Sequence, residues 1–361
     1  MGTGKGLYCY DFNEEMGTLS PFTSFHCSVG PNPTFLTIRD SFIYIVNEIS
    51  AHEVLNSEED ARPVVNSGQV ITSEQVQYDA LSVAVYAWNE QKQTMSLLNR
   101  KASGGNSPVH VAMNPSGTLV VVTNYGGSLS VYSILSPTGV LGECVYSVAF
   151  PWTSEVQQHT RQESSHPHSS VWISDDTFIV ADLGNDVLHS VSVLSKRYTS
   201  VPVPSGSGPR HMALHPIQRC LAVCMELNNT IVLYSLDLKD LLDVKSTLSD
   251  THQKEESPCL NLAAEIAWSP CGTFLYASNR GEDTIVCFRH LDQPKPTLLY
   301  VEHFSSGGRA PRHFKVLQKW ILVANQDDHT VVVFTRNGVT GKCEKISSNA
   351  CPSPVCIAIM S

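Results

Sequence analysis

Three arginines, two glutamates and a histidine at the ends of short apolar segments could perform proton transfer beside a bound anion. They are Arg210, Arg280, Arg312, Glu48, Glu226 and His168. A guanidinium presents a planar fork of donors that matches a carboxylate or a phosphate. Histidine and glutamate can take up or release a proton near neutral pH where their surroundings tune them. Together these residue types predict acid–base chemistry on an anionic substrate.

A repeated pair of strands carries these residues along the chain. Each unit opens with a short apolar strand, turns at Gly, Pro, Asn or Asp, and returns through a second apolar strand that closes on a polar pair. The units open at Pro33, Pro108, Pro167, Pro209, Ala264 and Pro311, and Pro354 starts one more shortly before residue 361. Most units continue into a third strand. This regular repeat favours a propeller of four-stranded antiparallel blades over a sandwich.

Six complete units and one incomplete unit predict an all-β, seven-bladed β-propeller in a single domain, residues 1–361. The strand Leu7–Tyr10 would complement the truncated last unit, so we expect the N-terminal and C-terminal strands to close the ring within one blade. Two polar, acidic stretches, about 50–77 and 239–260, interrupt the rhythm and predict surface insertions. In the second stretch we expect one helical turn around Leu241-Leu242.

The direction of the strands predicts that the charged residues meet at one mouth of the central channel. Neighbouring strands are antiparallel, so the start of each first strand and the end of each second strand lie at the same face. The first-strand starts are Val109, His168, Arg210, Glu265 and Arg312. The second-strand ends are Glu48, Tyr125, Leu183, Glu226, Arg280 and Gln326. Structural turn positions would look alike from blade to blade, whereas these differ and several are charged.

Each of these residues also has a structural interpretation. Arg210 and Arg280 could form ion pairs between blades, His168 could be held by the backbone of a turn, and Glu226 could accept N–H groups at a strand end. Three further histidines recur two residues after the opening proline, which favours a structural role for His110, His211 and His313. Asp182 opens Asp-Leu-Gly-Asn-Asp and is typical of an Asx-type turn. His166 and His168 lack a third ligand for a metal.

The composition narrows the classes of partner. A net charge of -10 argues against nucleic acid, whose binding depends on Lys and Arg. Eleven cysteines without a C-x-x-C motif predict free thiols in a reducing compartment. No apolar run reaches membrane-spanning length and no signal-peptide core is evident, so we expect a cytoplasmic protein without a membrane partner. Walker, dinucleotide and G-x-S-x-G motifs are missing from the sequence, and we expect neither an organic cofactor nor a metal.

The order of these motifs resembles the seven-bladed β-propeller lactonases, nearly end to end. That family includes a bacterial type of 6-phosphogluconolactonase and the carboxy-cis,cis-muconate lactonizing enzyme. The resemblance is carried by Tyr44-Ile45-Val46-Asn47-Glu48, Pro108-Val109-His110, His166-Pro167-His168-Ser169, Gly208-Pro209-Arg210-His211, Met225-Glu226-Leu227, Ser278-Asn279-Arg280-Gly281 and Val323-Ala324-Asn325-Gln326. It implies His168, Glu226, Arg210 and Arg280 as the catalytic residues. The neighbouring residues Arg312, Glu48, Gln326 and Asn279 are then expected to bind the substrate.

Three functional hypotheses follow. The first is a metal-independent lactonase for a sugar-acid lactone, above all 6-phosphogluconolactone. Arg210 and Arg280 would hold its anionic group or a developing oxyanion, while His168 and Glu226 would share the roles of general base and proton donor. The second is a muconate-type lactonizing enzyme that acts on a dicarboxylate with the same residues. The third is a non-enzymatic propeller that serves as an interaction platform.

Overall fold

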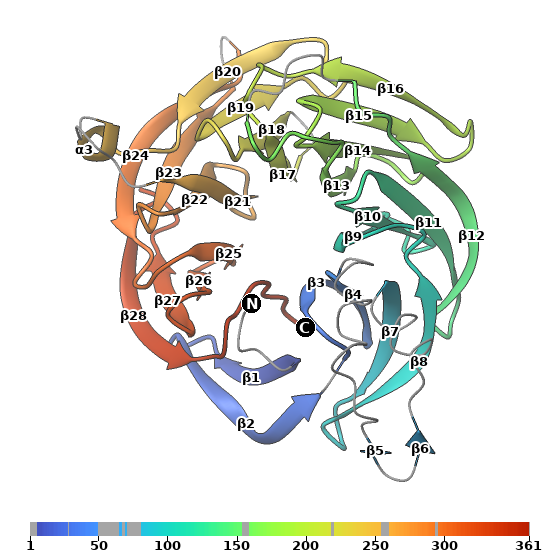
Figure 1. Cartoon of the computed structure of the whole chain (residues 1–361). Helices are drawn as coiled ribbons and strands as arrows, with labels where there is room; N and C mark the ends of the chain where they lie inside the picture. The colour runs from blue at the N-terminus through green and yellow to red at the C-terminus, as the bar shows by residue number, and fades with distance from the viewer. Residues whose placement is uncertain are drawn as a thin grey trace.

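The chain folds as a ring of antiparallel β-sheets around a central axis (Figure 1). The computed structural model describes residues 6–27, 29–49, 65–66, 69–70, 81–153, 159–217, 220–253, 260–292 and 295–360. Within these residues, six sheets have four strands each. Five of them follow the order of the chain from the axis to the rim, and in the sixth β5 and β6 fall between the second and third strands. The predicted β-propeller architecture with four-stranded blades is therefore confirmed.

The six complete blades have the following bounds, from the inner strand outward. The first contains β3 (Pro33–Arg39), β4 (Phe42–Asn47), β7 (Ser82–Asn89) and β8 (Thr94–Ala102). The second and third contain β9 (Pro108–Met113), β10 (Leu119–Asn124), β11 (Ser128–Leu135), β12 (Val140–Ala149), β13 (Pro167–Trp172), β14 (Thr177–Asp182), β15 (Val187–Ser192) and β16 (Arg197–Pro202). The fourth and fifth contain β17 (Pro209–Leu214), β18 (Leu221–Met225), β19 (Thr230–Tyr234), β20 (Leu241–Ser246), β21 (Leu262–Trp268), β22 (Phe274–Arg280), β23 (Thr284–Leu291) and β24 (Thr297–Ser305). The sixth contains β25 (Pro311–Val316), β26 (Trp320–Asn325), β27 (Thr330–Arg336) and β28 (Cys343–Ala350).

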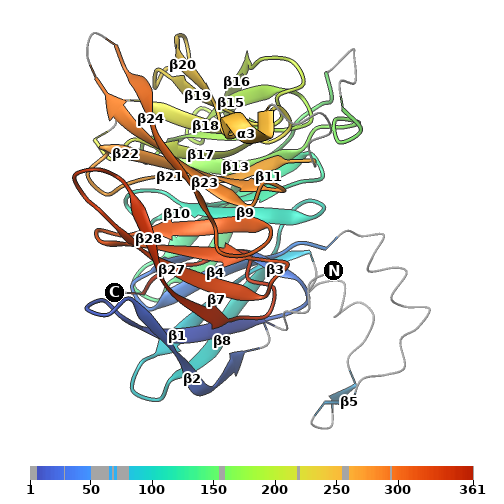
Figure 2. The same ribbon diagram turned by 90° about the vertical axis from the view of Figure 1, so that its left-hand side faces the viewer.

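The hydrophobic core forms layers between neighbouring blades, which stack face to face around the ring (Figure 2). Second strands are the most buried, because both of their faces contact an adjacent blade. In β26, for example, all six residues are buried. One such layer packs Ala222 and Cys224 of the fourth blade against Leu275 and Ala277 of the fifth. Short β-branched and aromatic runs suit these sandwiched positions, which explains why strands form here.

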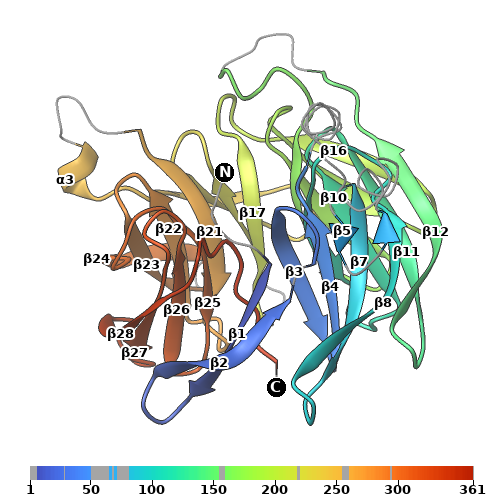
Figure 3. The same cartoon turned by 60° about the horizontal axis from the view of Figure 1, so that its bottom comes forward.

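The seventh position of the ring differs from the other six (Figure 3). It holds a two-stranded sheet of β1 (Leu7–Asn13) and β2 (Thr18–Cys27), while residues 351–360 run beside it outside any assigned strand. Both ends of the described chain therefore lie between the first and sixth blades, as the sequence predicts. A complete seventh blade closed by the two ends is not formed among the described residues.

The two predicted insertions have different outcomes. Most of the stretch 50–77 lies outside the described residues, apart from β5 (Val65–Asn66) and β6 (Gln69–Val70). The stretch 239–260 is not simply an insertion, because residues 241–246 form β20, the outer strand of the fourth blade. Its residues are exposed or half-buried, as is typical of a rim strand. Because the surrounding sequence is polar as well, the strand is hard to recognise from the sequence.

The helical turn expected around Leu241-Leu242 is wrong, since both residues lie in β20. Helix occurs a few residues later, in α3 (Asp250–Gln253), where an acidic residue begins the first turn. Of the helices in the described part of the chain, none is long and apolar enough to cross a membrane.

Candidate active site at one mouth of the channel

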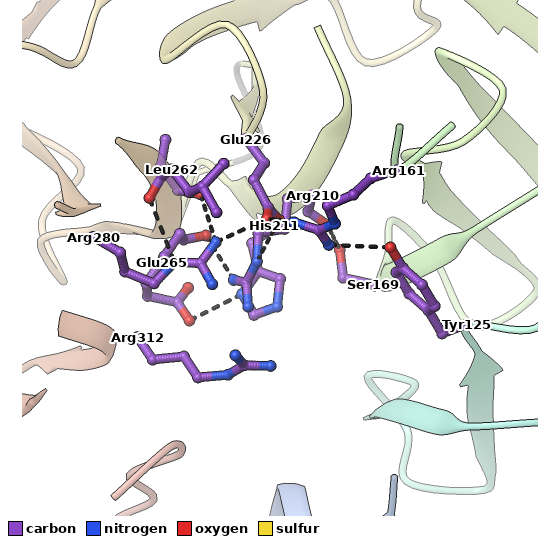
Figure 4. A network of polar contacts seen from close by, with 12 residues as sticks. Tyr125, Arg161, Ser169, Arg210, His211, Glu226, Leu262, Glu265, Arg280 and Arg312 are labelled. Carbon is purple, nitrogen blue, oxygen red and sulfur yellow. Dashed lines mark hydrogen bonds and ion pairs between the residues drawn. The ribbon is translucent and has the colours of Figure 1, made fainter. Parts of the chain in front are cut away.

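Glu226 is the centre of a cluster of arginines from three parts of the chain (Figure 4). It directly follows β18 and its side chain is fully buried. Arg280, at the end of β22, places Nη2 3.0 Å from Glu226 Oε1. Arg210, near the start of β17, places Nε 3.0 Å from Oε2, in an ion pair whose alignment is not that of a hydrogen bond. Arg161 donates a short hydrogen bond to Oε1.

These guanidinium groups hold Glu226 in its ionised form. Burial alone would raise the pKa of the carboxyl group, but Arg280, Arg210 and Arg161 more than offset that effect and lower the pKa to about 2. Glu226 is therefore an anion at neutral pH and has little tendency to accept a proton. Its carboxylate pairs with Arg161, Arg210 and Arg280.

Arg210 and Arg280 differ in how much of the guanidinium remains accessible. Arg210 is 2% exposed, and its Nη1 donates to the carbonyl of Ala264 at 2.8 Å. Burial and the neighbouring Arg280 lower the pKa of Arg210 to about 9, although Glu226 opposes this. Arg280 remains 14% exposed and makes long hydrogen bonds of 3.4 Å to the carbonyls of Leu262 and Ala263. Arg210 thus has the inter-blade role considered from the sequence, whereas Arg280 also reaches the surface of the mouth.

Arg161 is the principal member of the cluster that the sequence analysis missed. It lies in the loop before β13, outside the strand repeat, and 35% of its side chain is exposed. Its Nη2 donates to the hydroxyl of Tyr125 at 3.0 Å. The only signal in the sequence was its position seven residues before His168. The loop that leads into β13 must run to the mouth where His168 lies, so a residue of that loop can reach the same mouth.

The third blade anchors the loop that carries Arg161. Asp182 accepts hydrogen bonds from the Ser165 hydroxyl at 2.6 Å and from the backbone N–H groups of Gly184 and Asn185, which confirms the predicted Asx-type turn. Gln162 donates to the Leu183 carbonyl at 3.0 Å. A Cβ on Gly184 would lie 1.7 Å from the carbonyl oxygen of Ser164, so only glycine allows this close approach.

His168 supplies a neutral imidazole beside the arginines. The residue is 4% exposed, and its ring lies edge-on to Tyr125 at 5.7 Å and to His211 at 5.3 Å. Burial, then Arg210 and His211, hold its pKa well below the usual 6.5. Its Nδ1 is buried without a hydrogen-bond partner in the described structure. A neutral ring with an unused nitrogen can accept a proton from a bound molecule.

The other repeated histidines form the wall of the channel. His211 Nδ1 lies 3.0 Å from Glu265 Oε2, and His313 Nε2 lies 3.3 Å from the same oxygen. The ring of Phe35 packs against that of His110 in a tilted arrangement, with centroids 4.2 Å apart. Burial raises the pKa of Glu265, although His313 opposes this. These contacts among buried side chains agree with the structural role predicted for the three histidines.

His166 contributes to the scaffold of the mouth. Its ring stacks on Tyr125 with centroids 4.2 Å apart, and its Nδ1 lies 2.9 Å from the Tyr125 carbonyl oxygen. Its Nε2 lies 3.1 Å from a carboxylate oxygen of Glu163. The ring thus aligns Tyr125, which in turn contacts both Arg161 and His168.

The residues predicted to bind substrate separate into two groups. Arg312 Nη2 lies 3.9 Å from Glu48 Oε2, and the two side chains are 24% and 27% exposed. Both residues line a cavity of about 760 Å³ together with Gln326. Asn279, by contrast, is fully buried and donates to the Thr247 carbonyl at 2.6 Å. The structure thus directs its side chain into the blade junction and away from the mouth.

The mouth carries an excess of positive charge despite the acidic composition of the chain. Four guanidinium groups (Arg161, Arg210, Arg280 and Arg312) face Glu226 and Glu48, and the buried Glu265 also interacts electrostatically with Arg210, so the cations outnumber these carboxylates by one. Figure 4 shows Arg312 on the opposite side of the cluster from Arg161 and Tyr125. Accessible cations that converge on one space suit a ligand with a phosphate or more than one carboxylate.

Comparisons with known proteins agree with this architecture. Residues 1–359 match the model of a family described as "Lactonase, 7-bladed beta-propeller". The 6-phosphogluconolactonase of Formosa agariphila is 27% identical over 95% of this chain and 92% of its own length. The 6-phosphogluconolactonase of Bacillus subtilis is 26% identical over 77% of this chain and 80% of its own length.

Solved structures give the same result for the fold. A Bacteroides fragilis protein described as a candidate 6-phosphogluconolactonase superposes with a TM-score of 0.79 at 26% identity, over 98% of this chain and 94% of its own. The periplasmic gluconolactonase of Pseudomonas aeruginosa superposes with a TM-score of 0.81 at 23% identity, over 100% of this chain and 96% of its own. At that lower identity the second likeness concerns the fold alone.

Proposed function

Because the chain belongs to the seven-bladed β-propeller lactonase family, we propose that it hydrolyses a sugar-acid lactone at the mouth built around Glu226. The observation that supports this most strongly is the combination of one neutral, partly unbonded histidine with accessible arginines. His168 offers a base and the arginines offer anion binding, within one connected set of contacts.

We propose 6-phosphogluconolactone as the substrate. Curated relatives that match most of this chain bear the name 6-phosphogluconolactonase. The phosphate of such a substrate carries close to two negative charges at neutral pH and would be attracted by the excess of positive charge at the mouth. Arg161, Arg280 and Arg312 are the guanidinium groups with exposed surface, so they would contact the phosphate or the lactone carbonyl. Arg210 is almost fully buried, so it would contribute through its ion pair with Glu226 and not by direct contact with the substrate.

Lactone hydrolysis then needs one base, one anion-stabilising group and one proton donor. Neutral His168 takes a proton from water as the water oxygen bonds to the lactone carbonyl carbon. The negative charge on the carbonyl oxygen is stabilised by an adjacent guanidinium. As the tetrahedral intermediate collapses, the bond from carbon to the ring oxygen breaks and protonated His168 returns the proton to that oxygen. The low pKa of His168 makes its protonated form a ready donor.

Glu226 has a positioning role in this scheme. With a pKa of about 2 it carries no proton to give at neutral pH, and it is a weak base. We assign the base to His168 because its Nδ1 has no hydrogen-bond partner among the described residues, whereas the carboxylate of Glu226 is paired with three arginines. The carboxylate keeps Arg161 and Arg280 in place from one oxygen, Oε1, which sets the spacing between two anion-binding groups.

The proposal can be tested by hydrolysis assays on purified protein. Initial rates should be measured with 6-phosphogluconolactone, with the unphosphorylated gluconolactone, and with a muconate-type dicarboxylate as an alternative substrate. We expect the highest kcat/KM with the phosphorylated lactone. Turnover of the dicarboxylate alone would move the chain to the lactonizing class, and turnover of none of the three would contradict the proposal.

A binding measurement separates the site from its chemistry. The product 6-phosphogluconate should raise the melting temperature with increasing concentration, because it binds the folded state. Arg280→Met should abolish that shift, while Arg197→Met, on the outer strand β16, should leave it unchanged. Equal shifts in both variants would show that the phosphorylated acid binds elsewhere.

A further inference from the structure

The outer half of the third blade holds a serine, a histidine and an aspartate in one line of contacts. His189 of β15 places Nδ1 2.8 Å from Oγ of Ser200 on β16. Its Nε2 lies 3.3 Å from Oδ2 of Asp182, the last residue of β14. β16 is the outermost strand of this blade (Figure 1). The lactone chemistry proposed above uses neither Ser200 nor His189.

The contacts of Asp182 decide which nitrogen of His189 carries the proton. Burial alone would raise the pKa of the Asp182 carboxyl group, but hydrogen bonds from His189 and Ser165 more than offset that effect and lower it. An ionised carboxylate only accepts hydrogen bonds, so the proton of a neutral His189 ring lies on Nε2. Nδ1 then keeps its lone pair, and the hydroxyl of Ser200 must donate to it.

Aromatic side chains hold the imidazole in this orientation. The ring of Phe150 lies parallel to that of His189, with centroids 4.0 Å apart and planes at 2°. Tyr198 meets the same ring edge-on at 5.4 Å. His189 is buried, so its nitrogens stay directed at Asp182 and Ser200. Ser200 itself is exposed, and a molecule from solvent can reach its hydroxyl oxygen.

The third blade differs from the other five complete blades at these positions of the repeat. The residues that correspond to Asp182 are Asn47, Asn124, Met225, Asn279 and Asn325. Those that correspond to His189 are Ala84, Ser130, Val232, Val286 and Val332. A residue that only maintained the blade would resemble its counterparts. A carboxylate, an imidazole and a hydroxyl that meet in a single blade therefore favour a local chemical role.

The strand register adds a donor beside the hydroxyl. Val203 N donates to the Asp186 carbonyl at 2.9 Å, and hydrogen-bonded pairs alternate along an antiparallel ladder. His189 and Ser200 therefore form a pair without mutual main-chain hydrogen bonds, in which the side chains approach most closely. The N–H of Ser200 then points away from β15, towards the outer side of the sheet. From there it can donate to a negatively charged oxygen that forms next to Oγ.

We propose that Ser200 is the nucleophile of a second hydrolytic site, which takes small activated esters, with His189 as its base and Asp182 as a positioning residue. The contacts match the roles of nucleophile, base and orienting carboxylate that nucleophilic catalysis needs. Because Ser200 is exposed on a rim strand, the site suits compact substrates with a good leaving group, such as aryl esters.

The reaction balances within these groups and water. Ser200 Oγ bonds to the acyl carbon of the aryl ester as its proton passes to His189 Nδ1. The bond from that carbon to the aryl oxygen breaks, and the phenol leaves with the proton. Water then bonds to the acyl carbon and gives a proton to Nδ1. The acid leaves as Ser200 Oγ recovers that proton.

The alternative is that the hydroxyl of Ser200 only ties β16 to β15. The two strands already pair over six residues each. Water competes for an exposed hydroxyl, so this single contact adds little to the unfolding free energy. A purely structural contact would leave Ser200 as unreactive as another serine of the chain, and this difference can be measured.

Covalent labelling tests the proposal without a lactone assay. The probe is diisopropyl fluorophosphate, whose phosphorus bonds to a serine Oγ with loss of hydrogen fluoride. Ser353 is the internal control, because its hydroxyl lies 3.1 Å from His329 Nδ1 but that nitrogen also accepts the Ser353 N–H at 3.0 Å. We expect peptide mapping by mass spectrometry to find the label on Ser200 at a rate about a hundredfold above that on Ser353.

Variants separate the roles of the two side chains. His189→Gln should slow the labelling of Ser200 about a hundredfold. Ser200→Ala should abolish that label and lower the hydrolysis of p-nitrophenyl acetate about tenfold or more, with lactone hydrolysis unchanged. Ser353→Ala should change none of these rates. Asp182 is left intact because it also anchors the loop that carries Arg161.

Three results would overturn the proposal. The first is equal or absent labelling of Ser200 and Ser353 in the parent protein, a comparison that does not depend on the folding of any variant. The second is unchanged labelling of Ser200 in His189→Gln that circular dichroism shows to be folded. The third is undiminished ester hydrolysis by Ser200→Ala. Because labelling uses no lactone, failure here and failure of the proposed function are distinguishable.

Discussion

Glu226 and Glu48 occupy the same position of the repeat in two blades, yet their surroundings differ. Each follows directly on a second strand, β18 or β4. Glu226 is fully buried among three guanidinium groups, two of them 3.0 Å away. Glu48 is 27% exposed, and the nearest oxygen of its carboxylate is 3.9 Å from Arg312. The same position of the repeat thus holds a buried carboxylate with close ion pairs in one blade and a partly exposed carboxylate with a long ion pair in another.

The difference follows from what each blade has as its neighbour. Glu226 lies between complete blades, whose side chains exclude water and strengthen each ion pair. Glu48 and Arg312 lie on either side of the incomplete seventh position, where the walls stand apart. Because Glu226 is desolvated, removing its charge is expected to lower the unfolding free energy strongly. The pair of Glu48 and Arg312 is screened by solvent and contributes less. The predictions below use this contrast.

The largest effect is expected from Glu226→Gln. Removing the buried charge leaves three guanidinium groups without their common partner, and losses of this kind cost about 3–5 kcal/mol of unfolding free energy. Displaced arginines should also lower kcat/KM by about a hundredfold or more. Urea unfolding and lactonase assays measure the two effects. If Glu226→Gln and Glu48→Gln destabilised the chain equally, the contrast between the two sites would be wrong.

His168→Gln should reduce the rate without a comparable loss of stability. A positioned general base contributes roughly 10²–10⁴-fold to a rate, so kcat should fall by that factor. His110→Gln changes a buried histidine of the channel wall and serves as the control, with a rate within about tenfold of the parent. In the parent protein kcat/KM should stay level from pH 8 to 6.5, because His168 remains neutral there. Retention of full activity by His168→Gln would exclude it as the base.

Acid should weaken the Glu226 cluster in a defined pH window. The folded pKa of about 2 lies below the ordinary 4.5, so the contribution of Glu226 to stability is complete above pH 4.5 and is lost as the pH falls towards 2. The size of that contribution is roughly 3 kcal/mol. Unfolding free energies measured across this window should fall more steeply for the parent than for Glu226→Gln. Parallel curves would show that Glu226 does not titrate as proposed.

Arg312→Met should affect substrate binding more than stability. Hydrogen bonds to charged groups contribute about 1.5–3 kcal/mol, so loss of a phosphate contact should raise KM about tenfold or more for the phosphorylated lactone. The unphosphorylated lactone should show a smaller change, and Arg197→Met should change neither value. An equal effect on both lactones would place the phosphate away from Arg312.

The smallest effect is expected from Glu48→Gln. A partly exposed ion pair at this distance contributes less than about 1 kcal/mol to unfolding free energy. Removing the negative charge beside Arg312 should lower KM for the phosphorylated lactone by about twofold, as measured by initial rates. A rise in KM would instead indicate that Glu48 contacts a hydroxyl group of the substrate.

The sequence alone predicted the strands near the mouth well, because the repeat has a fixed register. His168, Arg210, Arg280 and Arg312 all lie within a residue or two of a strand start or end. Arg161 could not be predicted in the same way, since it lies in an irregular loop whose path depends on Asp182 and Gly184. Asn279 donates to the Thr247 carbonyl inside the blade junction, because adjacent residues of a strand point to opposite faces, and this orientation could not be told from the sequence repeat.

What the sequence determined is the architecture: the alternation of apolar strands and turns dictates four-stranded blades, and antiparallel pairing brings their charged ends to one face. What only the tertiary structure decided is the role of each charge there. Whether a carboxylate is sealed among arginines or left beside a cavity depends on the packing of neighbouring blades, because burial and distance set both its pKa and its partners. The same holds for the seventh position, where side chains far apart in the chain line one cavity.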